Sequence, residues 1–325
     1  MDLILQIIKC AGHLLVTSHA DPDGDAVGSL LALGLALKKI GKQTTLYNAS
    51  AIPAVYQFLP EVDGISRRLQ APETYDAALV LDCGDISRIG ESWPAVARVG
   101  VIINIDHHIS NTGFGQHQLI DGEACATAEI VYRLIRALGV ELDREIATAL
   151  YTGILTDTGS FRFSNTNAAA FAIAREMTEL GVDPYRVAQH VFGSYSLGRI
   201  KLLNLALNSI EISRNGKLSI MAITRSMLDE TGTQPEDTDG IINYARRIED
   251  VKVAALIQEQ ANGTAGTAGR TRVHVSLRSD GTVDVAALAG AFGGGGHYSA
   301  AGFQVEATIA DIKSRLIDID WVENI

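Results

Sequence analysis

Histidine and aspartate residues gather in one short segment near the amino end of the chain, residues 16–25 (VTSHADPDGD). The segment follows the apolar run 14–16, which predicts a buried strand, and precedes an apolar-periodic helix expected over about 26–40. Carboxylates held this close repel one another unless a cation neutralises them, and the adjacent His19 nitrogen suits Mn²⁺ and related ions. The alternative interpretation is an Asp-rich turn in which Asp25 caps the helix.

Two further strands are expected to end in the same kinds of side chain. The run 77–81 is an unbroken apolar stretch of the kind that parallel sheets bury on both faces, and 101–105 is expected to be another buried strand; acidic residues or histidines follow each directly. A helix over 144–155 leads into a polar loop with another aspartate. Because the carboxyl ends of parallel strands meet at one edge of a sheet, we expect these groups to form one metal site. The predicted ligands are His19, Asp23, Asp25, Asp82, His107 and Asp157.

This set is large enough for two cations. Two cations that share a carboxylate activate water and bind both oxygens of a displacement at phosphorus. Asp82 is the expected bridge because its strand should lie between the other two ligand-bearing strands. Neighbouring side chains of an extended backbone point to opposite sides, so one of His107 and His108 should bind metal and the other should contact substrate as a hydrogen-bond donor or general acid. Asp106 is then expected to orient an imidazole.

Strand and helix patterns alternate along the first part of the chain, which predicts an α/β fold with a parallel sheet. A helix over 196–210 is expected to join this part to a smaller α/β unit. We therefore predict a catalytic domain at 1–192, a helical linker at 193–213 and a C-terminal domain at 214–325.

The bulk composition excludes some classes of function. The chain has 325 residues, of which 47% are hydrophobic, and a net charge of −11, which argues against a large surface for duplex DNA but allows a small anionic substrate. We see no apolar run long enough to span a membrane and no basic leader, so we expect no membrane partner and a cytoplasmic location. The three cysteines are scattered, which is typical of a reducing compartment.

A second group of residues suits phosphate binding. The four glycines at 293–296, followed by His297, expose consecutive backbone N–H groups that favour an anion. Upstream, polar residues alternate with apolar ones, which predicts a strand with one polar face. Arg278 is the expected phosphate partner there because a guanidinium fork matches phosphate oxygens. The alternatives are a flexible linker and an ordinary solvated strand face. The polar face comprises Arg270, Arg272, His274, Ser276 and Arg278.

These motifs resemble those of the DHH phosphoesterases. Residues 19–25 look like the family's first motif and 81–85 like its second, and the sequence Asp-His-His at 106–108 is the signature that names the family. Residues 153–159 are similar to the fourth motif, and 293–302 to the glycine-rich motif of the DHH-associated C-terminal domain. The two-domain layout is most similar to the bacterial bifunctional oligoribonuclease/pAp phosphatase (NrnA-like) subgroup.

The resemblance implies a Mn²⁺-dependent phosphodiesterase or phosphomonoesterase with two divalent cations, Mg²⁺ being the alternative metal, and an active site in the cleft between the domains. It makes His107 a metal ligand and places His108 on the scissile phosphate; together with Asp106, expected to orient an imidazole, His108 forms the predicted catalytic pair. Expected substrates are short single-stranded RNAs of two to five nucleotides, degraded to mononucleotides, and 3′-phosphoadenosine 5′-phosphate (pAp), converted to AMP. A homodimer is compatible with the subgroup. The rest of the substrate would be held by Arg278, Gly294, Gly295, Gly296 and His297.

Two other functions stay open. One is hydrolysis of cyclic di-AMP or of its linear product pApA, a role that sensory or membrane segments often accompany in this family. The other is a nucleotide-binding regulator that does not hydrolyse, against which the complete ligand set argues. The loop 262–269 looks longer and richer in glycine than the family's pattern, which leaves the preferred substrate length open.

Overall fold

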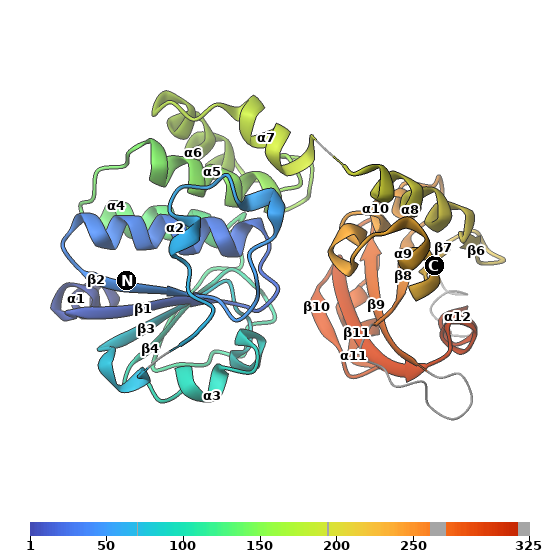
Figure 1. Cartoon of the computed structure of the whole chain (residues 1–325), viewed down its shortest axis with the longest axis horizontal. Coiled ribbons are helices and arrows are strands. Elements are labelled where there is room, and N and C mark those ends of the chain that lie inside the picture. The colour runs from blue at the N-terminus through green and yellow to red at the C-terminus, as the bar shows by residue number, and fades with distance from the viewer. Residues whose placement is uncertain (70, 194, 261–270, 318–325) are drawn as a thin grey trace. The chain divides into compact units, whose positions relative to one another are not determined.

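The computed structural model describes residues 1–69, 71–193, 195–260 and 271–317 (Figure 1). The chain forms two compact units, Met1–Ser194 and Tyr195–Ile325, each built around one β-sheet. The loop 262–269, and Arg270 beside it, lie outside the described residues.

The first unit contains a sheet of five strands that all run parallel, in the order β2-β1-β3-β4-β5. The predicted parallel sheet is confirmed, and β3, the strand that ends before Asp82, lies between β1 and β4. The strand β5 escapes prediction because half of its four residues are polar. The strands are β1 (His13–Ser18), β2 (Gln43–Tyr47), β3 (Ala77–Leu81), β4 (Ile102–Asp106) and β5 (His117–Ile120). The helices are α1 (Asp2–Cys10), α2 (Gly24–Lys39), α3 (Trp93–Val96), α4 (Thr127–Ala137), α5 (Arg144–Asp157), α6 (Ala168–Glu179) and α7 (Pro184–Phe192).

Apolar side chains cover both faces of this sheet, which is why its central strand β3 is an unbroken apolar run. On one face, Leu14 and Val16 of β1 share a core with residues of α2, α4 and α5. On the other face, Leu15 shares a smaller core with Val96 of α3. Figure 1 shows α2, α4 and α5 along one side of the sheet and α3 along the other.

Glycines let helices α2 and α5 approach closely. A Cβ atom on Gly28 of α2 would collide with the carbonyl oxygen of Ala149 in α5 and would lie 3.0 Å from the amide nitrogen of Gly153. A Cβ atom on Gly153 would in turn lie 2.8 Å from the side chain of Ala128 and 3.0 Å from Oδ1 of Asp25. Bare backbone at these positions therefore sets the distance between the two helices.

The second unit contains a mixed sheet of six strands in the order β10-β11-β9-β8-β7-β6. One face shares a core with α11 and α12, and the other with α8, α9 and α10. The predicted helix over 196–210 corresponds to α8, which packs on this sheet. The strands are β6 (Glu211–Ile212), β7 (Leu218–Ile223), β8 (Val253–Glu259), β9 (Thr271–Ser279), β10 (Gly295–His297) and β11 (Ala300–Ala307). The helices are α8 (Leu197–Asn208), α9 (Arg225–Thr231), α10 (Ile242–Arg246), α11 (Val285–Gly290) and α12 (Ile309–Ile317).

The glycine-rich run at 293–296 is not a flexible linker. Its second half forms β10 together with His297, and β10 is an edge strand that pairs antiparallel with β11. A Cβ atom on Gly294 would collide with the carbonyl oxygen of Gly302, and the φ angle of Gly296 is +147°. The hairpin therefore requires glycine at two of these positions on steric grounds.

Asp280 forms an ion pair in the turn that follows β9. Its Oδ2 lies 2.8 Å from Lys252 Nζ, and its Oδ1 accepts hydrogen bonds from the backbone N–H and the hydroxyl of Thr282 at 2.9 and 2.5 Å. Burial would raise the pKa of Asp280, but these contacts lower it to about 2. A carboxyl whose pKa falls on folding stabilises the fold above its ordinary pKa, and this contribution is lost as the pH falls through the lowered value.

We expect Asp280→Asn to lower the free energy of unfolding at pH 7 by about 1 kcal/mol, a modest value because both partners are about one-third exposed. The difference from the wild type should shrink as the pH falls from about 4 to about 2, since the wild-type carboxyl then becomes protonated. Scanning calorimetry over this range measures it. Asp229→Asn, which removes an exposed carboxylate from the same unit, should leave the melting temperature unchanged. A difference that does not depend on pH would contradict the ion-pair explanation.

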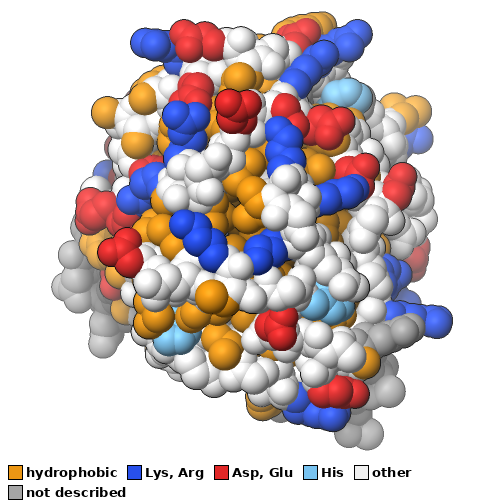
Figure 2. Space-filling view, turned by 90° about the vertical axis from the view of Figure 1, so that its left-hand side faces the viewer, with side chains coloured by type: hydrophobic (Ala, Val, Ile, Leu, Met, Phe, Trp, Pro, Cys, Tyr) orange, Lys and Arg blue, Asp and Glu red, His pale blue; other side chains and the backbone are white. Residues whose placement is uncertain are grey.

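Within the described residues, no helix combines the length and the apolarity that crossing a membrane requires. Figure 2 shows one face of the molecule, where Lys and Arg side chains are mixed with Asp and Glu side chains around patches of apolar surface. On the described part of this face, the positive charges form no continuous stripe of the kind that follows a nucleic-acid backbone.

Candidate metal centre

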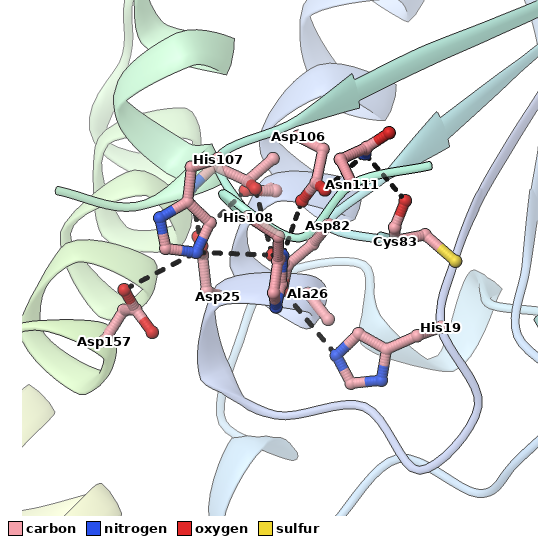
Figure 3. Close-up of polar contacts among 12 residues, drawn as sticks. His19, Asp25, Ala26, Asp82, Cys83, Asp106, His107, His108, Asn111 and Asp157 are labelled. Atoms are coloured by element: carbon pink, nitrogen blue, oxygen red, sulfur yellow. Dashed lines mark hydrogen bonds and ion pairs between the residues drawn. The ribbon is translucent and has the colours of Figure 1, made fainter. Parts of the chain in front are cut away.

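Three neighbouring strands of the first unit deliver polar groups to one edge of its sheet. His19 follows β1, Asp82 follows β3, and His107 follows β4. Figure 3 shows these side chains turned toward one another, with Asp82 in the middle. Asp82 Oδ2 lies 3.6 Å from His19 Nε2, and Asp82 Oδ1 lies 3.8 Å from His107 Nε2 and 3.7 Å from His108 Nδ1. A single buried carboxylate thus contacts three imidazoles.

The predicted ligands contribute to two groups of potential ligand atoms that share Asp82, and a further group joins Asp82 to Asp106 and His108. In the first group, one atom each of His19, Asp23 and Asp82 lie within 4.8 Å of one another. In the second group, the same holds for Asp25, Asp82 and His107. Each group combines carboxylate oxygens with one imidazole nitrogen, and Asp82 is positioned to contribute an oxygen to each.

Asp157 joins the second group from helix α5. Its Oδ2 lies 3.7 Å from His107 Nε2. The residue is the last of α5, whereas the sequence pattern places it in the polar loop that follows. Asn165 holds it there, because the Nδ2 group of Asn165 donates to Asp157 Oδ2 at 2.9 Å. With Asp157 included, all of the side chains predicted as ligands lie in one cluster.

Asp23 and Asp25 have different roles at the start of α2. Asp23 is the N-cap, and its Oδ1 accepts hydrogen bonds from the N–H groups of Asp25 and Ala26, both at 3.0 Å. The alternative in which Asp25 caps the helix is therefore wrong. Asp25 is buried, and its carboxylate accepts hydrogen bonds from the N–H groups of Thr127 at 2.6 Å and Ala128 at 2.9 Å. These are the first N–H groups of α4, so a helix N-terminus orients this carboxylate.

The charges of the cluster raise the pKa values of His19 and His107, the two histidines predicted as ligands. Burial alone would lower the pKa of His19, but its hydrogen bond to Asp82 and the charges of Asp23 and Asp82 raise it to about 9. Burial also acts against the charged form of His107, but the surrounding carboxylates, Asp157 first among them, raise the pKa of His107 to about 9. Without a cation, the carboxylates of the cluster therefore favour protonated imidazoles.

The pKa values of the carboxyl groups in the cluster are shifted in different directions. Burial and the charges of neighbouring carboxylates raise the pKa of Asp25, and they raise that of Asp157 to about 7. Burial acts in the same sense on Asp82, but its contacts with the histidines keep its pKa below the ordinary value. The cluster thus holds excess negative charge on buried oxygens that converge with two imidazole nitrogens. This donor set fits a divalent cation of intermediate hardness.

Asp106 pairs with His108. Asp106 Oδ1 lies 2.7 Å from His108 Nδ1. Burial would raise the pKa of Asp106, but the hydrogen bond and the charge of His108 lower it. Asp106 is therefore an ionised acceptor for the Nδ1 proton, and the Nε2 edge of the His108 ring is turned away from it.

Sequence reasoning missed the side chains that hold the charged groups in place. Thr127 Oγ1 donates to Asp82 Oδ1 at 2.9 Å, and Asn111 Nδ2 donates to Asp106 Oδ2 at 2.5 Å. Asn165 Nδ2 donates in the same way to the carboxylate of Asp157 in α5. Thr127 could have been noticed as a hydroxyl at the start of a predicted helix, and Asn111 as an amide just after the two histidines. Asn165 lies in a polar loop that gives no such signal.

In the second unit, the alternation predicted for β9 is confirmed, because its apolar residues are buried and the intervening ones are half-buried or exposed. Arg278 Nη1 donates to the carbonyl oxygen of Leu277 at 3.0 Å. Burial lowers the pKa of Arg278, while the charge of Asp239 acts in the opposite direction. In the sheet register, Arg278 pairs with Ala300 of β11, which pairs with His297 of β10. The arginine and the glycine-rich hairpin therefore belong to three adjacent strands.

Comparison with known proteins agrees with this description. The model of the DHH family, N-terminal domain, matches residues 13–154, and the model of the DHHA1 domain matches residues 215–319. The bifunctional oligoribonuclease and PAP phosphatase NrnA of Thermus thermophilus is 34% identical over 93% of this chain and 87% of that protein. The probable bifunctional oligoribonuclease and PAP phosphatase NrnA of Streptococcus mutans is 28% identical over 92% of this chain and 91% of that protein.

A solved structure also matches nearly the whole chain. It is the crystal structure of an exopolyphosphatase-related protein from Bacteroides fragilis, with a TM-score of 0.88 and 27% identity, covering 97% of this chain and 93% of that one. The matched family models, the relatives and the histidine–aspartate cluster lead to one assignment: the chain belongs to the DHH family of metal-dependent phosphoesterases and carries a DHHA1 domain.

Proposed function

We propose that this protein hydrolyses short oligoribonucleotides to mononucleotides and removes the 3′-phosphate of pAp, with Mn²⁺ as its metal. The observation that carries the proposal is the sharing of Asp82 by two groups of ligand atoms. A pair of cations bridged by a carboxylate is the arrangement that several enzyme classes use for displacement at phosphorus. The Thermus and Streptococcus relatives, whose names include oligoribonuclease and PAP phosphatase, support the choice of substrates.

The cluster divides into two proposed metal sites. When bound there, two cations supply Lewis-acid stabilisation of phosphoryl oxygens and a water nucleophile at neutral pH. The protein keeps the ligands preorganised, because buried Asp25 and Asp82 both accept hydrogen bonds from Thr127. One site would use His19, Asp23 and Asp82, and the other would use Asp25, Asp82, His107 and Asp157.

We assign His108 to the scissile phosphate. Because Asp106 accepts the Nδ1 proton, the ring is oriented with Nε2 toward the other side, and this nitrogen is a donor when both ring nitrogens carry protons. An N–H donor at this position would hydrogen-bond a phosphate oxygen and stabilise the negative charge that develops on it. Asp106 fixes the ring orientation of His108 and keeps a proton on its Nδ1.

The second unit would hold the rest of the substrate. Arg278 supplies a guanidinium fork that suits a phosphate or a carboxylate, and His297 lies two strands away in the same sheet. The backbone N–H groups of Gly294, Gly295 and Gly296 are proposed to assist, since β10 is an edge strand. Substrates that carry a second phosphate should benefit most from this unit.

Arg278→Lys is expected to raise KM for pAp about tenfold with a smaller change in kcat, because an ammonium group cannot form the paired contact of a guanidinium. Steady-state kinetics with pAp measures both constants. Arg214→Lys, the same change at an exposed arginine of the second unit, is the control and should leave KM unchanged. An equal loss of kcat and of kcat/KM in Arg278→Lys would instead assign the arginine to the chemical step.

A substrate panel tests the proposal directly. The wild-type chain is incubated with pAp, pApA, RNAs of two to ten nucleotides, cyclic di-AMP, pyrophosphate and polyphosphate, each with Mn²⁺ and with Mg²⁺. We expect turnover of pAp and of the shortest RNAs, with higher rates in Mn²⁺. Polyphosphate is included because the Bacteroides structure is described as exopolyphosphatase-related. Turnover confined to pyrophosphate or polyphosphate would contradict the proposal.

Two outcomes of the same panel would favour the other functions. Rapid hydrolysis of cyclic di-AMP, with pApA as the product or the next substrate, would identify a cyclic dinucleotide phosphodiesterase. Tight binding of pAp in Mn²⁺ without release of phosphate, measured by calorimetry, would identify a regulator that does not hydrolyse. Equal rates with Mg²⁺ and Mn²⁺ would remove the proposed metal preference and leave the reaction in place.

A further inference from the structure

We propose that Asn111 is a positioning residue of the active site, which fixes the Asp106–His108 pair and at the same time braces the backbone beside Asp82. The inference rests on the function proposed above, because it concerns how the residue on the scissile phosphate is oriented. Figure 3 shows Asn111 between Asp106 and the carbonyl group of Cys83. The residue lies outside the groups identified as ligands.

The hydrogen bonds of Asn111 fix the orientation of its amide. Nδ2 lies 2.5 Å from Asp106 Oδ2, 2.8 Å from Asn104 Oδ1 and 3.3 Å from the carbonyl oxygen of Cys83. These three atoms are acceptors, whereas Oδ1 of Asn111 accepts the N–H of Gly113 at 2.7 Å. The amide nitrogen must therefore face Asp106, because the opposite orientation would place an oxygen against a carboxylate.

Asn111 acts on His108 through Asp106. One oxygen of Asp106 accepts from Asn111 and the other accepts from His108 Nδ1 at 2.7 Å. Asp106 is fully buried, and the carboxylate can satisfy both donors only in one rotation of its plane. Loss of the amide donor would free this rotation and, with it, the direction of the His108 ring.

Asn111 also contacts the backbone that presents Asp82. The φ angle of Asp82 is +53°, a left-handed conformation that costs an L-residue on the order of 1 kcal/mol. The next carbonyl group, that of Cys83, accepts one hydrogen bond from Asn104 at 3.1 Å and one from Asn111 at 3.3 Å. Asn104 is fully buried in β4, so this pair of amides ties the turn after β3 to the neighbouring strand.

A merely structural role would be to anchor the loop after His108. Asn111→Asp still accepts the N–H of Gly113 but gives Asp106 a like charge in place of a donor, and the neutral Asn111→Ser removes the donor without adding charge; together they separate the two roles. Thr112→Val is the matched control. The Thr112 hydroxyl donates to the carbonyl oxygen of Gly84 at 3.2 Å, so the variant loosens the same loop without touching Asp106.

Steady-state kinetics on pAp with Mn²⁺ is the first readout. We expect Asn111→Asp to lower kcat about 10- to 100-fold with KM within about threefold of the wild type, and Thr112→Val to change kcat less than threefold. Asn111→Ser, a neutral variant that can still cap Gly113 but is too short to hold Asp106, carries the same expectation if Asn111→Asp does not fold. Equal losses in Asn111→Asp and Thr112→Val would overturn the proposal.

The second readout is the ring N–H proton of His108 in metal-free protein, followed by ¹H NMR and assigned by its loss in His108→Gln. A proton held between His108 and a fixed Asp106 should give a slowly exchanging low-field signal in the wild type and in Thr112→Val, and should be broadened or lost in Asn111→Asp. An unchanged signal in Asn111→Asp overturns the proposal. Because this readout does not need turnover, it decides the role of Asn111 even if the wild type hydrolyses none of the panel, which would refute the proposed function instead.

Discussion

Asp82→Asn is expected to lower kcat for phosphoester hydrolysis by about 1000-fold while the fold stays intact. A neutral amide would not supply the negative charge that both groups of ligands share. If the transition state loses about 4 kcal/mol of stabilisation, the rate falls about 1000-fold, at about 1.4 kcal/mol per factor of ten. Asparagine is the right replacement because it tolerates the left-handed backbone at this position, where φ is +53°. Kinetics with pAp, together with far-UV circular dichroism, measures activity and fold separately.

Asp21→Asn is the matched control for this variant. Asp21 also has a left-handed backbone and belongs to the same acidic segment, but its carboxylate accepts a hydrogen bond from Ser50 at 2.9 Å and belongs to none of the ligand groups. We expect its kcat within about threefold of the wild type. A wild-type rate in Asp82→Asn would show that the reaction does not need Asp82 as a shared metal ligand. A loss of rate in both variants would show that the acidic segments in general, and not Asp82 as a ligand, are needed. Calorimetric titration with Mn²⁺ should show weakened binding only in Asp82→Asn.

Gly28→Ala is expected to destabilise the first unit by about 2 kcal/mol. In an ordinary helix this change stabilises by about 1 kcal/mol, because alanine favours helix more than glycine does. Here the added methyl group would collide with the carbonyl oxygen of Ala149, which is backbone and cannot rotate away, so overpacking decides the sign. Thermal unfolding should show a melting temperature lower by several degrees. Because Asp25 belongs to α2 and Asp157 to α5, Mn²⁺ affinity should fall as well.

Gly100→Ala is the control for the packing argument. A Cβ atom at Gly100 would meet no atom within 4 Å, so the same chemical change should leave the melting temperature and the Mn²⁺ affinity nearly unchanged. If Gly28→Ala melts at the wild-type temperature, the absence of a side chain at position 28 is not what sets the distance between α2 and α5.

The sequence predicts the parallel sheet and the convergence of its strand ends because both depend on local patterns. Unbroken apolar runs such as 77–81 are a direct consequence of burial on two faces. Once the strands are parallel, their carboxyl ends must meet, so residues as distant as His19 and His107 can be placed together without any knowledge of packing. The central position of Asp82 is a separate expectation about strand order, which the order β2-β1-β3-β4-β5 confirms.

Features that depend on tertiary contacts could not be predicted in this way. The donors around Asp25 are backbone N–H groups of a helix more than a hundred residues later, and no side-chain pattern marks them. The boundary between α5 and its loop depends on Asn165, which holds Asp157 from outside the helix. The glycine-rich run at 293–296 looks like a linker until the carbonyl oxygens of Gly302 and Ala300 are seen to occupy the space that side chains at Gly294 and Gly296 would need.

The left-handed backbone of Asp82 limits which amino acids can occupy this position. Glutamate has the same charge and is only one methylene longer, but its side chain favours this conformation less than the short side chains of aspartate and asparagine do. The backbone conformation therefore restricts which amino acids suit position 82, in addition to the requirement for a negative charge. Replacing this aspartate with glutamate would change the backbone preference and the position of the carboxylate together, so conformation as well as chemistry favours aspartate as the central acid.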